Sequence, residues 1–256
     1  ENRTENWGTP SAVAGSLILR ADVRFFGGFE GWRGGAGAQE TALGQRNLAE
    51  NIAVIDGSAA RGGSPAYHVV VFSSSGANSV LDGFHITGGN AAGTPGSGDY
   101  HTWRGGGIYN WESKPLIRNC VVFNNTAAVS GGGLINESYG ANEADAVIEN
   151  CLFYGNVAGR VADDSANPIR GGGAIFNNNA NPVLRHVTVF YNTLGNPGYT
   201  QFGAYSGGIY NFSSSPAIDS SIVWGNTSGD IQDDHPLGDT SAAVVSYSNA
   251  TYAYQV

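Results

Sequence analysis

The chain contains no methionine, a single lysine (Lys114) and only two cysteines among its 256 residues. Charged residues make up 13% of it, against roughly 25% in ordinary globular proteins, and the formal net charge is −9. Because phosphate backbones are bound by clustered Lys and Arg, the composition argues against nucleic acid as a partner. It also disfavours an anionic membrane surface. No stretch approaches the 18 apolar residues of a membrane-spanning helix, so we expect no membrane insertion by this chain.

What the chain does contain is a repeat. Two or three glycines, an apolar pair and an asparagine recur as GGGIYN (105–110), GGGLIN (131–136), GGGAIFN (171–177) and GGIYN (207–211). A partner phrase recurs as NCVVFNN (119–125), NCLFYGN (150–156), HVTVFYN (186–192) and SSIVWGN (220–226), with a degenerate first copy, DGFHITGGN (82–90). The phrases return every 31–36 residues. Self-similarity at such a period indicates a solenoid.

Each partner phrase predicts two short strands joined by a bend. Its apolar positions alternate as in a strand, but one extra residue interrupts the alternation at Asn119, Asn150, His186 and Ser220. Asparagine tolerates the left-handed conformation that such corners need. Stacked coils would align these bend residues, and would align Asn110, Asn136, Asn177 and Asn211 in a second polar ladder. The pattern therefore predicts a single all-β domain, a parallel β-solenoid of roughly seven coils, with N-terminal coils in 1–80, regular repeats in 81–231 and a C-terminal coil in 232–256.

The two cysteines, Cys120 and Cys151, occupy equivalent positions in successive repeats. Neighbouring parallel strands lie about 4.8 Å apart, which is within the Cα range of a disulfide. Free cysteine also behaves as a small buried hydrophobe. We favour two stacked thiols, and the disulfide stays open as the alternative. The spacing of Cys and His fits no metal site, and we expect neither a metal nor a cofactor.

Several segments carry a family resemblance: FFGGFEG (25–31), YHVVVF (67–72), LDGFHITGGNA (81–91), SIVWGNTSGDI (221–231) and VSYSN (245–249). With the repeat phrases, they make the chain resemble the right-handed parallel β-helix proteins of bacterial surfaces and secretions, of the polymorphic-outer-membrane-protein-like and choice-of-anchor type. The resemblance implies a right-handed β-helix and a secreted or cell-surface location. It leaves function open, because such helices host lyases, hydrolases, adhesins and fibres. It also implies more sequence at both ends, so the chain is either a piece of a longer protein or has ends covered by another subunit.

Long insertions fall at one place in the repeat, at 91–104, 157–170 and 193–206, and stacking predicts that they form a loop-built wall along one edge. Insertions of this kind commonly mark a solenoid's binding face. Aromatic rings can stack on sugars while planar polar groups bond hydroxyls, or the same rings can pack down and hold the loops. The candidate glycan-binding residues of this wall are Tyr100, Trp103, Arg160, Tyr199, Gln201 and Tyr205.

Catalytic residues are harder to identify. A polysaccharide lyase needs a base and a cation, for which His101, Arg104 and Arg170 are the candidates. A glycoside hydrolase needs two carboxylates, and Asp163 and Asp164 are a weak candidate pair. The Asp233–Asp234 pair is expected in a turn before Pro236. With no recognisable catalytic set, we favour an extracellular structural or adhesive β-helix that binds glycan or assembles into fibres; a lyase or hydrolase acting along the loop-lined face is the alternative.

The ends of the solenoid give one more expectation. Terminal coils expose unpaired strand edges, and solenoid ends normally carry polar caps. The segment 242–256 contains no charge and alternates apolar and polar residues like a strand. We therefore expect at least one end to be covered, by a domain outside this chain or by head-to-tail self-association with another copy.

Overall fold

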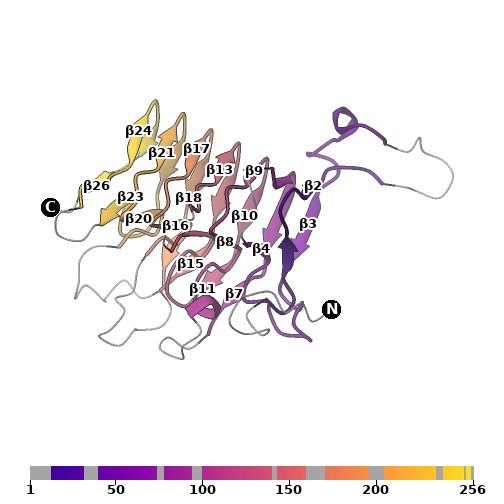
Figure 1. Ribbon diagram of the computed structural model, residues 1–256, viewed down its shortest axis with the longest axis horizontal. Coiled ribbons are helices and arrows are strands. Elements are labelled where there is room, and N and C mark those ends of the chain that lie inside the picture. The colour runs from indigo at the N-terminus through magenta and orange to yellow at the C-terminus, as the bar shows by residue number, and fades with distance from the viewer. Residues whose placement is uncertain are drawn as a thin grey trace.

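The computed structural model describes residues 13–31, 40–73, 78–93, 100–139, 143–159, 171–195, 205–234, 239–250 and 252–254. Almost all regular structure in them is parallel β-strand, arranged in four sheets. The strands stack coil upon coil along one axis, from the N-terminal coils to the C-terminal ones (Figure 1). The predicted parallel β-helix is confirmed.

Sheet A has eight strands, each following the glycines of a repeat where the repeat is regular. They are, in spatial order, β1 (Leu17–Leu19), β4 (Val70–Ser73), β8 (Ile108–Trp111), β12 (Leu134–Glu137), β16 (Ile175–Asn178), β20 (Ile209–Phe212), β23 (Ile231–Asp234) and β26 (Tyr252–Tyr254). Asp233 and Asp234 lie in β23, so the turn expected there is wrong; the strand continues because both residues pair with β20.

Sheets B and C come from the two halves of the partner phrase. Sheet B contains β2 (Arg24–Phe26), β5 (Val80–Asp82), β9 (Leu116–Arg118), β13 (Val147–Glu149), β17 (Val183–Arg185), β21 (Ala217–Asp219) and β24 (Val244–Ser246). Sheet C contains β3 (Ala53–Asp56), β6 (Phe84–Thr87), β10 (Val121–Phe123), β14 (Leu152–Tyr154), β18 (Thr188–Phe190), β22 (Ile222–Trp224) and β25 (Asn249–Ala250).

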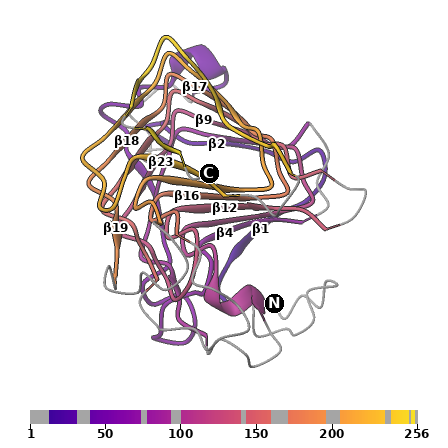
Figure 2. The same ribbon diagram turned by 90° about the vertical axis from the view of Figure 1, so that its left-hand side faces the viewer.

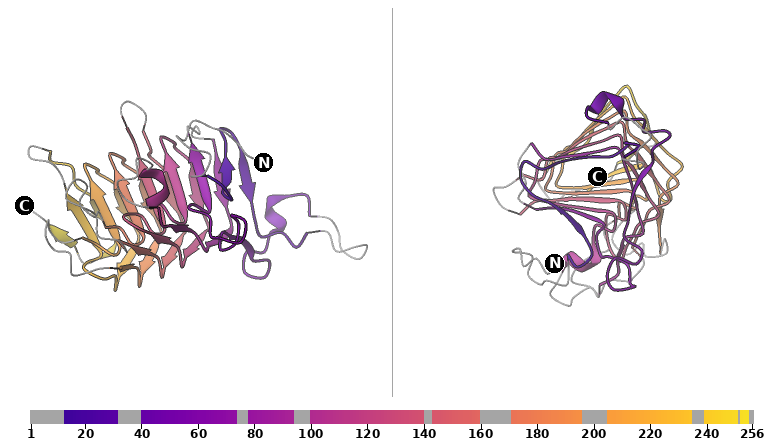
Figure 3. Two further views of the ribbon diagram at one scale, coloured as in Figure 1. Left: turned by 90° about the horizontal axis from the view of Figure 1, so that it is seen from below. Right: turned by 90° about the vertical axis from the view of Figure 1, so that its right-hand side faces the viewer.

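A small sheet D joins sheet C to sheet A. It contains β7 (Asn90–Ala91), β11 (Thr126–Ala127), β15 (Val157–Ala158) and β19 (Thr193–Leu194). Seen along the axis, sheets A, B and C enclose a common interior (Figure 2). A 3₁₀ turn, η1 (Leu43–Gln45), lies between β2 and β3 in the chain and stands outside the stacked coils at the N-terminal end (Figure 3).

The bends between sheets B and C form as predicted. Asn119, Asn150, His186 and Ser220 all have φ between 49° and 53°, the left-handed region that asparagine tolerates best among these residues. The tandem glycines are required for a different reason, which is the close approach of neighbouring backbone. A Cβ on Gly106 would lie 2.2 Å from the carbonyl oxygen of Thr126, and one on Gly132 would lie 2.5 Å from that of Val157. Sheet A can approach the adjoining coil this closely only without side chains.

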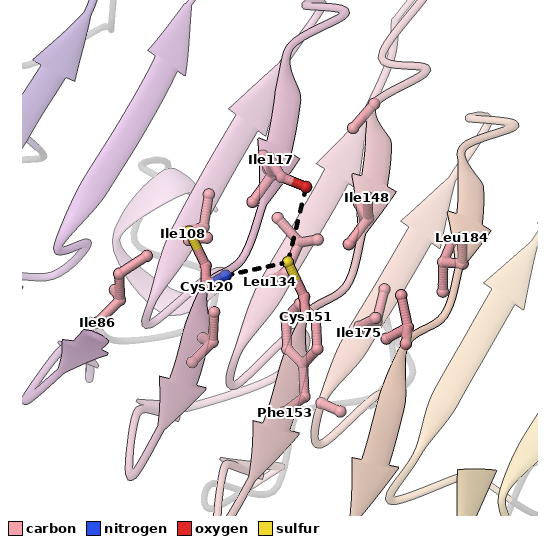
Figure 4. Close-up of a cluster of buried hydrophobic side chains, with 14 of the residues drawn as sticks. Ile86, Ile108, Ile117, Cys120, Leu134, Ile148, Cys151, Phe153, Ile175 and Leu184 are labelled. Atoms are coloured by element: carbon pink, nitrogen blue, oxygen red, sulfur yellow. Dashed lines mark hydrogen bonds between the residues drawn. The ribbon is translucent and has the colours of Figure 1, made fainter. Parts of the chain in front are cut away.

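The interior is filled by apolar side chains at alternate positions of most strands of sheets A, B and C, and it includes both cysteines (Figure 4). Cys120 and Cys151 are buried and free, with the Cys120 backbone N–H 3.5 Å from Cys151 Sγ. The prediction of stacked thiols is confirmed. Each thiol lies 3.2 Å from the carbonyl oxygen two residues before it.

Two asparagine ladders run through the interior where the sheets turn. In the predicted one, the amide N–H groups of Asn110, Asn136 and Asn177 each donate to the next asparagine, and Asn211 donates to Asp233. The second ladder runs from Asn125 through Asn156, Asn192 and Asn226 to Asp230. An amide donates and accepts, whereas a carboxylate only accepts, so each aspartate ends its ladder without leaving a buried N–H unpaired.

Candidate functional site

The described end of the first predicted insertion, residues 100–104, packs against sheet A. A 3₁₀ helix, η2 (Tyr100–Trp103), lies outside this sheet (Figure 2). Of the predicted site residues, His101, Trp103, Arg104 and Tyr205 are described in full, and Tyr100 by its backbone. The remainder, Arg160, Asp163, Asp164, Arg170, Tyr199 and Gln201, lie outside the described residues.

The four described side chains turn inward, onto the sheet. Their exposed fractions are 8% for His101, 3% for Trp103, 8% for Arg104 and 8% for Tyr205. Trp103 packs on Ala128 and Val129, and Tyr205 packs 5.7 Å from the ring of Tyr210. Rings in these positions hold the insertions against sheet A. Their predicted role in binding or catalysis stays a prediction.

His101 and Arg104 meet at a carboxylate that sequence analysis missed, Glu137. Arg104 Nη1 lies 2.7 Å from Glu137 Oε1, which also accepts hydrogen bonds from Asn178 Nδ2 and the Tyr139 hydroxyl. The Tyr109 hydroxyl donates to Glu137 Oε2, and His101 Nδ1 lies 2.9 Å from the Tyr109 oxygen. We call these six side chains the Glu137 cluster.

Strand register explains how the cluster forms. Glu137 is the last residue of β12, and the same position holds Trp111 in β8, Asn178 in β16 and Phe212 in β20. The same position also holds Asp234 in β23, and acidic residues among aromatic and amide residues there were the available sequence signal. Tyr210 and Asp234 repeat the arrangement, with the Tyr210 hydroxyl 2.5 Å from Asp234 Oδ2.

The electrostatics of the Glu137 cluster favour a closed, internally bonded unit. Burial and the neighbouring Glu137 raise the pKa of Tyr109, which keeps its phenol protonated. Burial alone would lower the pKa of Arg104, but Glu137 outweighs it and the pKa is raised. Since Tyr109 gives its only proton to Glu137, its oxygen accepts from His101, whose Nδ1 therefore carries a hydrogen. The carboxylate is neutralised and fully hydrogen-bonded by its own chain.

A second histidine lies on the other side of Tyr109. His68 is fully buried, its Nδ1 lies 2.7 Å from the carbonyl oxygen of Gly105, and its ring meets the Tyr109 ring edge-on at 4.8 Å. Its Nε2 has no hydrogen-bond partner among the residues that the structure describes. Burial lowers the pKa of His68 to about 3, so the ring is neutral and acts as an uncharged packing group near neutral pH.

The outer face of sheet C has the opposite character, and sequence analysis did not single it out. Four aromatic side chains, one from each coil, stand in register at its outward positions: Phe123, Tyr154, Phe190 and Trp224. Phe123 and Tyr154 stack at 5.2 Å between ring centroids, and Tyr154 and Phe190 at 5.5 Å. The signal was available, because each partner phrase has an aromatic residue two positions before its last asparagine.

A second row runs beside this aromatic row and consists of His85, Val121, Leu152, Thr188 and Ile222. We call the two rows together the aromatic face. It becomes more exposed toward the C-terminal coils, where Ile222 is 52% and Trp224 56% exposed, and Tyr191 at the adjoining bend is 59% exposed. The two rows contain no Asp, Glu, Lys or Arg.

The aromatic face still contains polar groups. Among the described residues, the hydroxyls of Tyr154 and Thr188 and the indole N–H of Trp224 form no hydrogen bond within the chain. Burial lowers the pKa of His85, so this imidazole is also neutral near pH 7. Aromatic side chains with uncharged donors and acceptors at their tips can contact an apolar surface and at the same time form hydrogen bonds with hydroxyl groups.

The neighbouring sheet B shows how charges are placed elsewhere. Its outward row alternates in sign along the axis through Asp82, Arg118, Glu149, Arg185 and Asp219. Arg118 lies 2.9 Å from Asp82, and Arg185 lies 3.3 Å from Glu149. Both arginines of this row are therefore paired within the chain.

Within the described ranges, no group of three or more His, Cys, Asp or Glu side chains could hold a metal ion. In the same residues, no helix is long and apolar enough to span a membrane. No family model, curated protein or solved structure matches this chain. The resemblance to bacterial surface β-helices and the location that it implies therefore stay predictions.

Proposed function

We propose that this protein is a non-catalytic extracellular β-helix that adheres to glycan through the aromatic face of sheet C. The observation that carries the proposal is an uncharged row of rings on a regular sheet, half-buried at Phe123, Tyr154 and Phe190 and 56% exposed at Trp224. Large aromatic side chains normally contribute their area to a core or an interface. An apolar patch held open to solvent on a rigid scaffold commonly marks an interaction site.

The scaffold suits an adhesive role. The interior is bonded across coils by two asparagine ladders, so neighbouring coils keep a constant spacing. A ligand that spans several coils thus meets groups already in position, which lowers the entropy cost of binding. The extracellular location is supported by the resemblance to surface β-helices.

The Glu137 cluster supports a structural role for the side of sheet A. A lyase or hydrolase there would need His101 or Arg104 to act on substrate, whereas Arg104 is paired with Glu137 and His101 bonds to Tyr109. Both side chains are also more than nine-tenths buried. In this proposal the cluster anchors η2 to sheet A.

The test is co-sedimentation of the purified chain with a panel of insoluble neutral and acidic polysaccharides. We expect binding that Tyr154→Ala and Trp224→Ala each weaken at least tenfold. Tyr139→Ala serves as the matched variant, because it removes a 46%-exposed tyrosine that stacks on Trp111 outside sheet A. It should leave binding unchanged.

Two outcomes would overturn the proposal. Loss of binding in Tyr139→Ala with retention in Tyr154→Ala would assign the glycan to sheet A. Release of unsaturated products or reducing ends, abolished by His101→Ala, would establish the lyase or hydrolase alternative.

A further inference from the structure

The aromatic row has the same repeat as the solenoid axis. Coil after coil, Phe123, Tyr154, Phe190 and Trp224 occupy one register position, and the first two ring-to-ring steps are 5.2 and 5.5 Å. These steps are close to the spacing of about 4.8 Å between neighbouring strands. Thr87 continues the row in β6. The row therefore places five uncharged side chains at one register position in successive coils, parallel to the axis.

The width of the face is much smaller than its length. Each strand of sheet C between β10 and β22 has three residues, of which two point outward. At about 3.3 Å per residue, the face is only about 7–10 Å wide across the strands. A long ligand that uses all of it must lie along the axis.

The stacked rings also set the shape of the face. Because Phe123, Tyr154 and Phe190 stack with interplanar angles of 14° and 22°, their faces are turned toward one another and only their edges are left to solvent. The rings form a ridge, and the shorter side chains Val121, Leu152 and Thr188 form a lower shelf beside it. A ribbon-shaped ligand can lie on the shelf with one edge against the ridge.

Charge restricts the chemistry of the ligand. The aromatic face has no cation to bind a carboxylate or sulfate, and the chain as a whole has a net charge of −9. In the outward row of the neighbouring sheet B, Arg118 and Arg185 each pair with an acidic residue. Anionic polymers would be repelled without local compensation. An uncharged polymer meets no such penalty and can bond to the Tyr154 and Thr188 hydroxyls.

We propose that the aromatic face binds a single uncharged, extended, β-linked polysaccharide chain that runs parallel to the solenoid axis with about one sugar per coil. This inference rests on the proposed function and names its ligand and geometry. An extended chain of equatorially linked hexoses is flat, straight and advances by about one strand spacing per sugar. An α-linked glucan coils, and so leaves a straight row after a few residues.

The experiment is calorimetric titration with neutral β-1,4-linked oligosaccharides of about two to eight sugars, and with α-1,4-linked ones of the same lengths. The affinity for the β-linked series should rise with each sugar and level off at about five. Trp224→Ala removes the last ring of the row and should shift this plateau down by about one sugar. Tyr154→Ala interrupts the middle of the row and should bring the plateau down to about two.

The outcomes separate this inference from the function on which it rests. Binding that Tyr154→Ala weakens, but that levels off at two sugars in the unaltered chain or is equal for the α-linked series, would overturn the axial geometry and leave the adhesive function standing. Tighter binding of an acidic polysaccharide than of any neutral one would overturn the uncharged ligand. A chain that binds no glycan would overturn both.

Discussion

Sheets A and C share one backbone geometry, but their outer faces treat polar groups in opposite ways. On sheet A, a carboxylate, a guanidinium, a histidine and a tyrosine are buried and bonded to one another. On sheet C, the outward side chains from β6 to β22 are uncharged and range from half-buried to exposed, and among the described residues the Tyr154 and Thr188 hydroxyls and the Trp224 indole N–H form no hydrogen bond. Residue types that are common in catalytic sites are thus hydrogen-bonded within the chain on sheet A. Residue types that are common in protein cores are exposed to solvent on sheet C.

The physical reason is the cost of burying charge. An ionised side chain under an insertion must be paired and hydrogen-bonded, or its desolvation is not compensated. Glu137 satisfies this condition with four donors. A row of rings has no such requirement, because stacking between coils already favours it. The two faces therefore differ in whether their polar side-chain groups are hydrogen-bonded within the chain, more than in residue type.

Removing the carboxylate of Glu137 should have the largest effect. Glu137→Gln leaves the buried Arg104 charge without its partner, and we expect a loss of about 3–5 kcal/mol in the free energy of unfolding, measured by urea denaturation. The double variant Glu137→Gln with Arg104→Gln removes both charges and should recover most of this loss. If the double variant is as unstable as the single one, the ion pair is not what holds this face.

Much of the fold was predictable from the sequence. The repeat phrases located the strands of sheets A, B and C, and the asparagines at their ends predicted the Asn110 ladder and the bends. The reason is that a solenoid places equivalent residues in contact, so sequence period becomes spatial register. The second ladder, through Asn125 and Asn156, was equally visible as the last residue of each partner phrase but was not recognised.

The candidate site was much less predictable. The loop wall was chosen because insertions commonly bind ligands, but whether His101 and Arg104 face solvent depends on Glu137, which lies 33 residues beyond Arg104 in the chain. For the aromatic face, the direction in which each aromatic side chain points could not be predicted. An aromatic residue in a strand can point into the core, as Phe153 does, or outward, as Tyr154 does. Only the register of the strand decides between them.

The second prediction contrasts a histidine on each face. His68 has a folded pKa of about 3, below the ordinary value of about 6.5 for an unfolded chain. Between these values the unfolded state binds the extra proton, so stability is lost as the pH falls below 6.5 and is restored as it rises. His68→Asn keeps a donor for the Gly105 carbonyl. In this variant the fall in the free energy of unfolding between pH 7 and pH 5 should be smaller by about 2 kcal/mol than in the unaltered chain.

The matched variant is His85→Asn on the aromatic face. Burial also lowers the pKa of His85, which gives the same sign, but this ring is half-exposed and the effect should be smaller. Denaturation midpoints measured from pH 7 to pH 5 compare the two variants with the unaltered chain. An equal flattening in both would mean that burial does not distinguish the two faces.

The last prediction concerns the aromatic row itself. Tyr154→Ala removes two stacked pairs, with Phe123 and Phe190, each worth about 0.5–1.5 kcal/mol. Because this side chain is only partly buried, it loses less burial than a core aromatic would, and we expect a total cost of about 1–3 kcal/mol in thermal denaturation. Leu152→Ala is the control, since it removes a side chain of the same strand and face that belongs to neither ring stack; it should cost less.

A loss above about 4 kcal/mol in Tyr154→Ala, comparable with that of a fully buried aromatic, would show that the aromatic row is a structural part of the solenoid. A small loss accompanied by weakened glycan binding would instead show that these rings are kept at the surface for a partner.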